Sequence, residues 1–146
     1  MTSLYFDTAY LCKMYWPESG SPEVAKFAAR ADVLVCGLHG RAEFLSIGHR
    51  KVREGVVTSR QLAGLFEQFR ADCAVGAIRL LPLTDTTVDL VERIFLQAPA
   101  SVFLRAAHGL HLACAAEHGF AEIYSNDHHL LAAAPLFGVR GVDVLA

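Results

Sequence analysis

The sequence predicts an α/β fold in which helices cover a mostly parallel sheet. Short apolar runs of β-type residues alternate along the chain with longer segments that repeat apolar residues at the helical period. This alternation is typical of strand–helix–strand units, whose strands pair in parallel. Two consecutive helices, predicted at residues 39–55 and 58–76, have no strand between them. We expect this pair to form a hairpin that projects from the sheet.

The remaining elements follow from local signals. Residues 3–11 begin as a strand that ends at Asp7 and continue as a helix for which Thr8 is a plausible cap. Further strands are predicted at 32–37, 77–83, 121–126 and 139–145, and further helices at 21–31, 84–98, 103–120 and 127–138. Ser21, followed by Pro22, is a typical helix start, and Gly55 is a typical helix end.

Length and composition indicate a single globular domain over residues 1–146. Hydrophobic residues make up 53% of the chain and charged residues 19%, which is enough apolar material for a substantial core. The formal net charge of −2 neither indicates nor excludes a local basic groove. The first residues lack the pattern of a signal peptide, and no uncharged run approaches a membrane span. The four cysteines are scattered and form no CxxC pair, so we expect free thiols in a cytoplasmic protein.

Three acidic residues are predicted to meet at one edge of the sheet. Asp7 closes the first strand, Asp127 follows the strand at 121–126, and Glu43 lies one turn into the helix after the strand at 32–37. In open α/β sheets, ligands collect beyond the carboxyl ends of the strands. Three carboxylates in one place repel one another unless a cation lies between them, and a hard divalent cation fits oxygen ligands. Alternatively, Asp7 and Asp127 cap helices and Glu43 is a solvated helix residue.

Three stretches resemble the PIN-domain ribonucleases, specifically the VapC-type toxins of bacterial toxin–antitoxin pairs. They are "YFDTAYLCKMYWPESGS", "RAEFLSIGHRKVREG" and the C-terminal third from "FLRAAHGLHLACAAEHGF" onward. The resemblance follows nearly the whole chain in order and spacing. It implies a PIN-like three-layer α/β/α sandwich and a nuclease that depends on Mg²⁺ or Mn²⁺.

The family pattern has four acidic positions, and three of them match here as Asp7, Glu43 and Asp127. The fourth lies in the family pattern "LRAxDALHLA". The corresponding residues of this chain are "LRAAHGLHLA". The resemblance therefore puts His108 where the family has a carboxylate. Imidazole suits Mn²⁺ or Zn²⁺ better than Mg²⁺, so we expect weakened Mg²⁺ binding and reduced cleavage. Asp and His codons can differ by one base. A second hypothesis is therefore that His108 arose as a change that inactivates a lethal toxin.

Neighbouring residues have supporting roles in this interpretation. His111 is expected to be a packed, hydrogen-bonded core histidine. Thr8, Ser125 and Asn126 are candidates to orient a carboxylate, or they are plain caps. Basic residues are candidates for contacts with the RNA backbone, or they are ordinary solvated side chains: Arg41, Arg50, Arg105 and His128.

The resemblance also implies partners and leaves two functions open. The partners are a VapB-like antitoxin, an RNA read as an exposed single strand, such as a loop of tRNA or of another structured RNA, and a second copy of the chain in a homodimer. The first function is an RNA-cleaving toxin. The second is an impaired PIN-fold protein that binds RNA or antitoxin without cleaving. A phosphoryl-accepting receiver domain also uses acids at strand ends, but the helical hairpin and the lack of any Lys after Lys51 argue against it.

Overall fold

The strands and helices occur in the order that the sequence predicts, and the computed structural model describes all residues from Met1 to Ala146. The strands are β1 (Ser3–Tyr5), β2 (Val33–Gly37), β3 (Ile78–Leu81), β4 (Glu122–Tyr124) and β5 (Arg140–Val142). The helices are α1 (Thr8–Cys12), α2 (Ser21–Ala28), α3 (Gly40–Arg53), α4 (Ser59–Ala74), α5 (Asp85–Gln97), α6 (Ala106–Glu117) and α7 (His128–Ala133), followed by the 3₁₀ helix η1 (Ala134–Phe137).

Every strand pair is parallel, as the alternation of strands and helices predicts. β2 lies between β1 and β3, and β4 pairs with β5. A single parallel bridge between Phe6 and Tyr124 joins the two sets, so the strands follow the order β3-β2-β1-β4-β5. β1 and β4, which are far apart in sequence, therefore end side by side.

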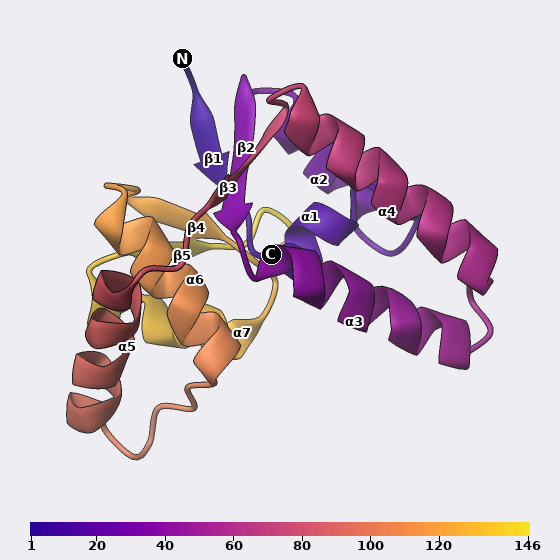
Figure 1. Ribbon diagram of the computed structural model, residues 1–146. Helices are drawn as coiled ribbons and strands as arrows, with labels where there is room; N and C mark the ends of the chain where they lie inside the picture. Colours follow the sequence, from indigo (N-terminus) through magenta and orange to yellow (C-terminus); the bar gives the residue numbers. More distant parts are fainter.

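Helices cover both faces of the sheet, which confirms the three-layer arrangement (Figure 1). Successive side chains of a strand point to opposite faces. Tyr5 and Val35 accordingly pack with residues of α6, α7 and η1, and α5 packs outside them. Phe6 and Cys36 pack on the other face with residues of α1, α2, α3 and α4. The sheet is thus buried on both sides, as parallel sheets usually are.

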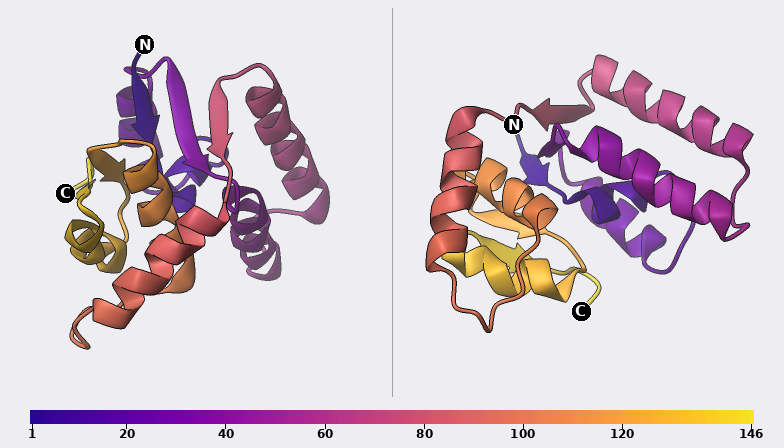
Figure 2. Two further views of the ribbon diagram at one scale, coloured as in Figure 1. Left: turned by 60° about the vertical axis from the view of Figure 1, so that its left-hand side comes forward. Right: turned by 60° about the horizontal axis from the view of Figure 1, so that its bottom comes forward.

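α3 and α4 form the predicted hairpin and extend beyond the sheet (Figure 2). Aromatic side chains hold the two helices together near the sheet, where Phe44 and Phe69 stack with ring centroids 4.9 Å apart. Farther out, a Cβ atom at Gly48 would collide with the side chain of Leu62. Glycine at this position therefore allows the two helices to approach closely.

Thr8 and Ser21, which the sequence favoured at helix starts, do not cap their helices. Asp7, the alternative cap, caps α1, because its carboxylate accepts a hydrogen bond from the Tyr10 N–H. Gly20, and not Ser21, precedes α2, with a left-handed φ of 86° that glycine adopts at little cost. The hydroxyl of Ser21 instead accepts from the Glu18 N–H and donates to the Trp16 carbonyl. Both hydroxyls are thus available for contacts outside the caps.

The cysteines agree with a further expectation from the sequence. All four cysteines are free thiols, and Cys12, Cys36 and Cys114 are buried. None of the helices combines the length and the apolar character that crossing a membrane requires.

Candidate functional site

A pocket of about 490 Å³ opens at the carboxyl ends of β1 and β4, and Asp7, Glu43, His108 and Asp127 all line it. Asp7 follows β1, Asp127 follows β4, and α3 carries Glu43 after β2. The Asp7 N–H donates to the Tyr124 carbonyl at 3.0 Å, which fixes the two strand ends against each other. The parallel strands therefore bring together residues that are up to 120 positions apart in sequence.

Asp7 is a buried carboxylate that is held by two hydrogen bonds. Its side chain is only 4% exposed. Oδ1 accepts from the Tyr10 N–H at 2.9 Å, and Oδ2 accepts from the Ser125 hydroxyl at 2.6 Å. Burial raises the pKa of Asp7, and this effect exceeds the lowering by His111 and by the two hydrogen bonds. The groups around Asp7 therefore offset only part of the free-energy cost of burying its negative charge.

Asp127 both caps a helix and faces the pocket. Its Oδ1 accepts from the N–H groups of His129 and Leu130, at 2.9 and 3.2 Å, and so caps α7. Its Oδ2 lies 3.5 Å from Nε2 of His108. Partial burial acts to raise the pKa of Asp127, but the cap hydrogen bonds and His108 outweigh it, so the pKa is lowered. The helix cap, one of the two alternatives from the sequence, uses Oδ1 and leaves Oδ2 facing the pocket.

Ser125 connects the two aspartates. It is completely buried. Its hydroxyl donates to Asp7 and accepts from the Asp127 N–H at 2.9 Å. Ser125 thereby positions both acidic residues, whereas its neighbour Asn126 is exposed and lines the pocket.

His108 lies in the first turn of α6 and points to Asp127. Its side chain is 16% exposed, and Nε2 forms the 3.5 Å contact with the Asp127 carboxylate. Its Nδ1 is buried without a hydrogen-bond partner. The imidazole thus occupies one wall of the acidic pocket rather than the apolar core.

Glu43 is held by a hydroxyl and an imidazole. Oε1 accepts from the Thr8 hydroxyl at 2.8 Å and from Nε2 of His111 at 2.7 Å. Burial acts to raise the pKa of Glu43, but these hydrogen bonds and His111 lower it to about 2. A Cβ atom at Gly40 would lie 3.3 Å from Oγ1 of Thr8 and 2.9 Å from Sγ of Cys36. Glycine at this position therefore lets α3 approach α1 closely enough for the Thr8–Glu43 contact.

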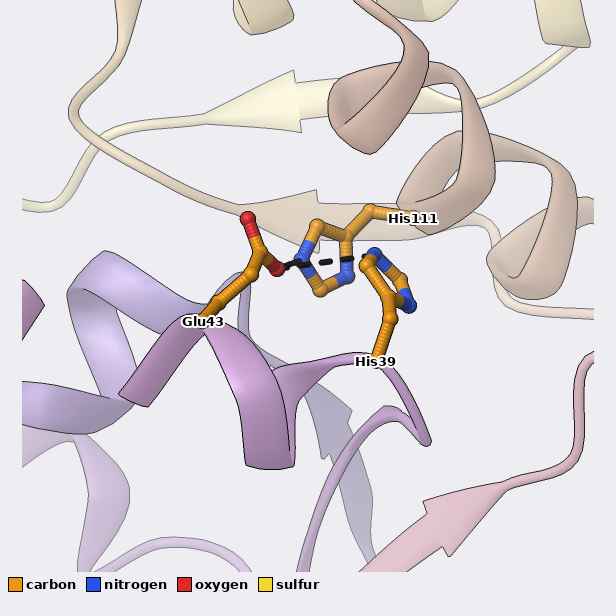
Figure 3. A group of neighbouring side chains, drawn as sticks. All are labelled: His39, Glu43 and His111. Carbon is orange, nitrogen blue, oxygen red and sulfur yellow. Dashed lines mark hydrogen bonds and ion pairs between the residues drawn. The ribbon is translucent and has the colours of Figure 1, made fainter. Parts of the chain in front are cut away.

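His111 is buried and hydrogen-bonded, as the sequence favoured, but its partner is Glu43. Because a carboxylate only accepts, Nε2 of His111 carries the proton, and Nδ1 accepts from the Tyr5 hydroxyl at 2.9 Å. His39, at the start of α3, lies beside this pair (Figure 3). Its ring centroid is 4.0 Å from that of His111, and its Nε2 is 3.5 Å from Glu43.

No role for His39 was predicted from the sequence. The available signal was its position four residues before Glu43, where both side chains of a helix share one face. One donor atom from each of His39, Glu43 and His111 lies within 4.8 Å of the others, which is a donor set suited to a borderline cation such as Zn²⁺. In this structure Nε2 of His39 bonds the Ala107 carbonyl at 3.2 Å and Nε2 of His111 bonds Glu43. His39 and His111, together called the clamp on Glu43, therefore orient this carboxylate.

His39 predicts a pH dependence of stability. Burial and nearby His111 lower the pKa of His39 to about 4 from 6.5. Between these pKa values the folded protein binds fewer protons than the unfolded chain. The contribution of neutral His39 to the free energy of unfolding is therefore complete above pH 6.5 and is lost as the pH falls toward 4. The ring is 12% exposed, which reduces the effect through solvent screening. We expect the unmodified protein to lose about 1 kcal/mol more of its unfolding free energy between pH 7 and pH 5 than His39→Gln loses.

Urea unfolding at the two pH values measures this difference. His49→Gln serves as the control, because His49 is exposed on the same helix and does not line the pocket. Equal losses in the His39 variant and in the unmodified protein would show that His39 is not held neutral.

Basic side chains frame the acidic pocket. Arg50 from α3 and Arg105 before α6 line it, together with His128 and His129 from α7. Arg41 does not reach this pocket, and it lines a separate hollow beside Phe69 on the hairpin. Three of the four predicted RNA-backbone candidates are therefore close to the carboxylates, and Arg41 is not.

The sequence matches the PIN domain family over residues 4–135. This match covers most of the chain and includes the four family positions, Asp7, Glu43, His108 and Asp127. The chain belongs to the PIN-domain family. Comparison with curated proteins found no match in sequence.

Solved structures share this PIN fold at low sequence identity. FitAB bound to an IR36 DNA fragment is 14% identical, with a TM-score of 0.70 over 98% of this chain and 96% of that one. FitAcB from Neisseria gonorrhoeae is 15% identical, with a TM-score of 0.67 over 97% and 98%. VapC20 from Mycobacterium tuberculosis, described as a toxin that cleaves the sarcin–ricin loop, is 16% identical, with a TM-score of 0.66 over 94% and 98%. At these identities the likeness concerns the fold.

Proposed function

We propose that this PIN-domain protein is a metal-dependent endoribonuclease toxin of the VapC type, and that His108 weakens its catalysis. One observation carries the proposal: three carboxylates from distant parts of the chain line the same pocket as His108, at the carboxyl ends of parallel strands. The fold shared with VapC20, described as a toxin that cleaves the sarcin–ricin loop, supports the reaction class.

The residues that line the pocket have oxygen donors suited to a divalent cation. In this structure only His39, Glu43 and His111 bring donor atoms within 4.8 Å of one another, so a cation bound by Asp7, Glu43 and Asp127 would draw these carboxylates closer together. Oε2 of Glu43 accepts no hydrogen bond, and Oδ2 of Asp127 has only the 3.5 Å contact with His108. Each oxygen of Asp7 accepts one hydrogen bond and keeps a second lone pair. Asp7, Glu43 and Asp127 are therefore the proposed ligands for Mg²⁺ or Mn²⁺. When bound, such an ion supplies an activated water and neutralises charge on the phosphate.

The chain's own groups orient these ligands and attract the substrate. Ser125 holds Asp7 and the Asp127 backbone in one arrangement, and Thr8 with His111 fixes one oxygen of Glu43. Such supporting contacts typically contribute a factor of 10 to 100 in metal affinity or activity. Arg50 and Arg105 at the rim provide positive charge for a phosphodiester.

His108 supports a second candidate function. Its Nε2 faces Asp127 at 3.5 Å, so it places an imidazole where a carboxylate would add a hard oxygen ligand. A protein with this change binds RNA or an antitoxin without efficient cleavage in Mg²⁺. Imidazole remains a suitable ligand for Mn²⁺, so activity in Mn²⁺ distinguishes the two functions.

We also propose a cognate VapB-like antitoxin and a homodimer. The likeness to FitAB and FitAcB is consistent with a toxin–antitoxin assembly. α5 exposes Val88, Phe95 and Leu96, whose burial against a second copy would remove apolar surface from water. An antitoxin that inserts a basic side chain among the carboxylates would complement their charge.

Cleavage of RNA by the purified protein tests the proposed function. A structured RNA with single-stranded loops is incubated with the protein in Mn²⁺, in Mg²⁺ and in EDTA, and products are resolved on a denaturing gel. We expect discrete products in Mn²⁺, fewer in Mg²⁺ and none in EDTA. Products of equal intensity in EDTA would show that cleavage does not need the cation, and the absence of products in Mn²⁺ would favour the binding protein.

A further inference from the structure

A row of four planar side chains lies at the edge of the acidic pocket: Arg105, Phe103, His129 and His128. The rings of Phe103 and His129 lie 4.5 Å apart, and those of His129 and His128 are also 4.5 Å apart. The guanidinium of Arg105 lies 5.1 Å from the ring centre of Phe103. Neighbouring rings are tilted, with interplanar angles of 40° between Phe103 and His129 and 46° between His129 and His128.

This row is not part of the core. Phe103 is 49% exposed, and His128 and Arg105 are also exposed, so aromatic surface is kept in contact with water. Exposed aromatic rings that group together at the edge of a polar pocket indicate a binding surface rather than core packing. The two hydrophobic clusters of the core contain none of these residues.

The row is attached directly to the acidic pocket. His128 and His129 follow Asp127 at the start of α7, and both line the pocket with Arg105. A phosphodiester held at Asp127 would therefore place its neighbouring nucleotide at these rings. Arg105 and the two imidazoles add donors suited to the adjoining phosphate.

We propose that Phe103, His128 and His129 form a stacking platform for an unpaired nucleobase of RNA, next to the phosphodiester that is cleaved. This inference rests on the proposed function and specifies its substrate as a single-stranded segment. An unstacked base gains contact with aromatic faces, whereas a base inside an A-form helix is already stacked and cannot reach them. The platform selects for an exposed base without reading its identity, because every base has a π face.

The test separates base stacking from attraction to the backbone. Two fluorescent RNAs are compared, an eight-nucleotide oligoadenylate and a fully abasic ribose-phosphate chain of equal length. Binding is measured by anisotropy in Ca²⁺, with a gel to verify that the RNA stays intact. We expect the unmodified protein to bind the oligoadenylate about tenfold more tightly than the abasic chain. In Phe103→Ala this ratio falls toward one, while affinity for the abasic chain is kept.

Two variants act as controls. Phe103→Trp restores a stacking face and should restore the ratio. Val75→Ala shortens an apolar side chain that is 78% exposed just after α4, and should leave the ratio unchanged. An unmodified protein that binds both chains equally well would overturn the platform while the nuclease proposal stands. An unmodified protein that binds neither chain would overturn both.

Discussion

Replacing His108 by Asp is expected to raise RNA cleavage in Mg²⁺ at least about tenfold. The imidazole points at the Asp127 carboxylate from 3.5 Å, so an Asp at this position adds an oxygen ligand on the same wall of the pocket. Mg²⁺ prefers carboxylate and water, whereas imidazole suits later transition metals. The gain in rate should accordingly be larger in Mg²⁺ than in Mn²⁺. Initial cleavage rates in both metals measure the effect.

A second readout distinguishes ligand binding from a general change in stability. His108→Asp adds a negative charge beside three carboxylates, so the metal-free variant should melt at a lower temperature. Saturating Mg²⁺ should then raise its Tm more than it raises that of the unmodified protein. His49→Asp adds the same charge on an exposed face of α3 outside the pocket and should show neither effect. An unchanged rate and an unchanged response to Mg²⁺ in His108→Asp would contradict the assignment.

Replacing Asp7 by Asn is expected to reduce cleavage in Mn²⁺ by about 100-fold or more without lowering the free energy of unfolding. Asp7 is 4% exposed, and burial raises its pKa, so its charge destabilises the folded state. The amide oxygen of Asn can still accept from the Tyr10 N–H and cap α1. Its amide nitrogen cannot accept from Ser125 but can donate to that hydroxyl oxygen, so the loss of the present hydrogen bond is partly replaced and is offset by removal of the buried charge. Loss of activity with equal or higher stability is the signature of a residue kept for its charge rather than for packing.

Asp143→Asn is the matched control for Asp7→Asn. Asp143 accepts a hydrogen bond from the Tyr10 hydroxyl and does not line the pocket, so its variant should keep full cleavage. Chemical denaturation of both variants gives the free energies. A clear loss of stability in Asp7→Asn would mean that this carboxylate serves the fold, and retained cleavage would remove it from the site.

The sequence predicted the parts of the site that depend on strand order. Asp7 and Asp127 lie at the ends of strands whose β-type residues and following helices are recognisable locally, and parallel pairing then places both at one edge. The hairpin was also predictable, because no strand separates its helices. The family resemblance added the position of His108, which no periodicity indicates.

The contacts across elements were not predictable. The clamp on Glu43 depends on how α6 lies against β2 and α3, which brings His111 within 2.7 Å of a residue 68 positions away. Thr8 has the residue type of a helix cap, yet its hydroxyl donates to Glu43 because Asp7 takes the cap. Phe103 and His129 meet only in the folded chain. Side-chain pairs of this kind are set by tertiary packing, which competes with local propensity and here prevails.

The position of Mn²⁺ in crystals of the protein, located by its anomalous scattering, shows whether the three carboxylates form one cation site. We expect one ion in the pocket between β1 and β4, in contact with the carboxylates of Asp7 and Asp127 and close to Glu43. An ion held only by His39 and His111, or no ion among the carboxylates at saturating Mn²⁺, would contradict this expectation.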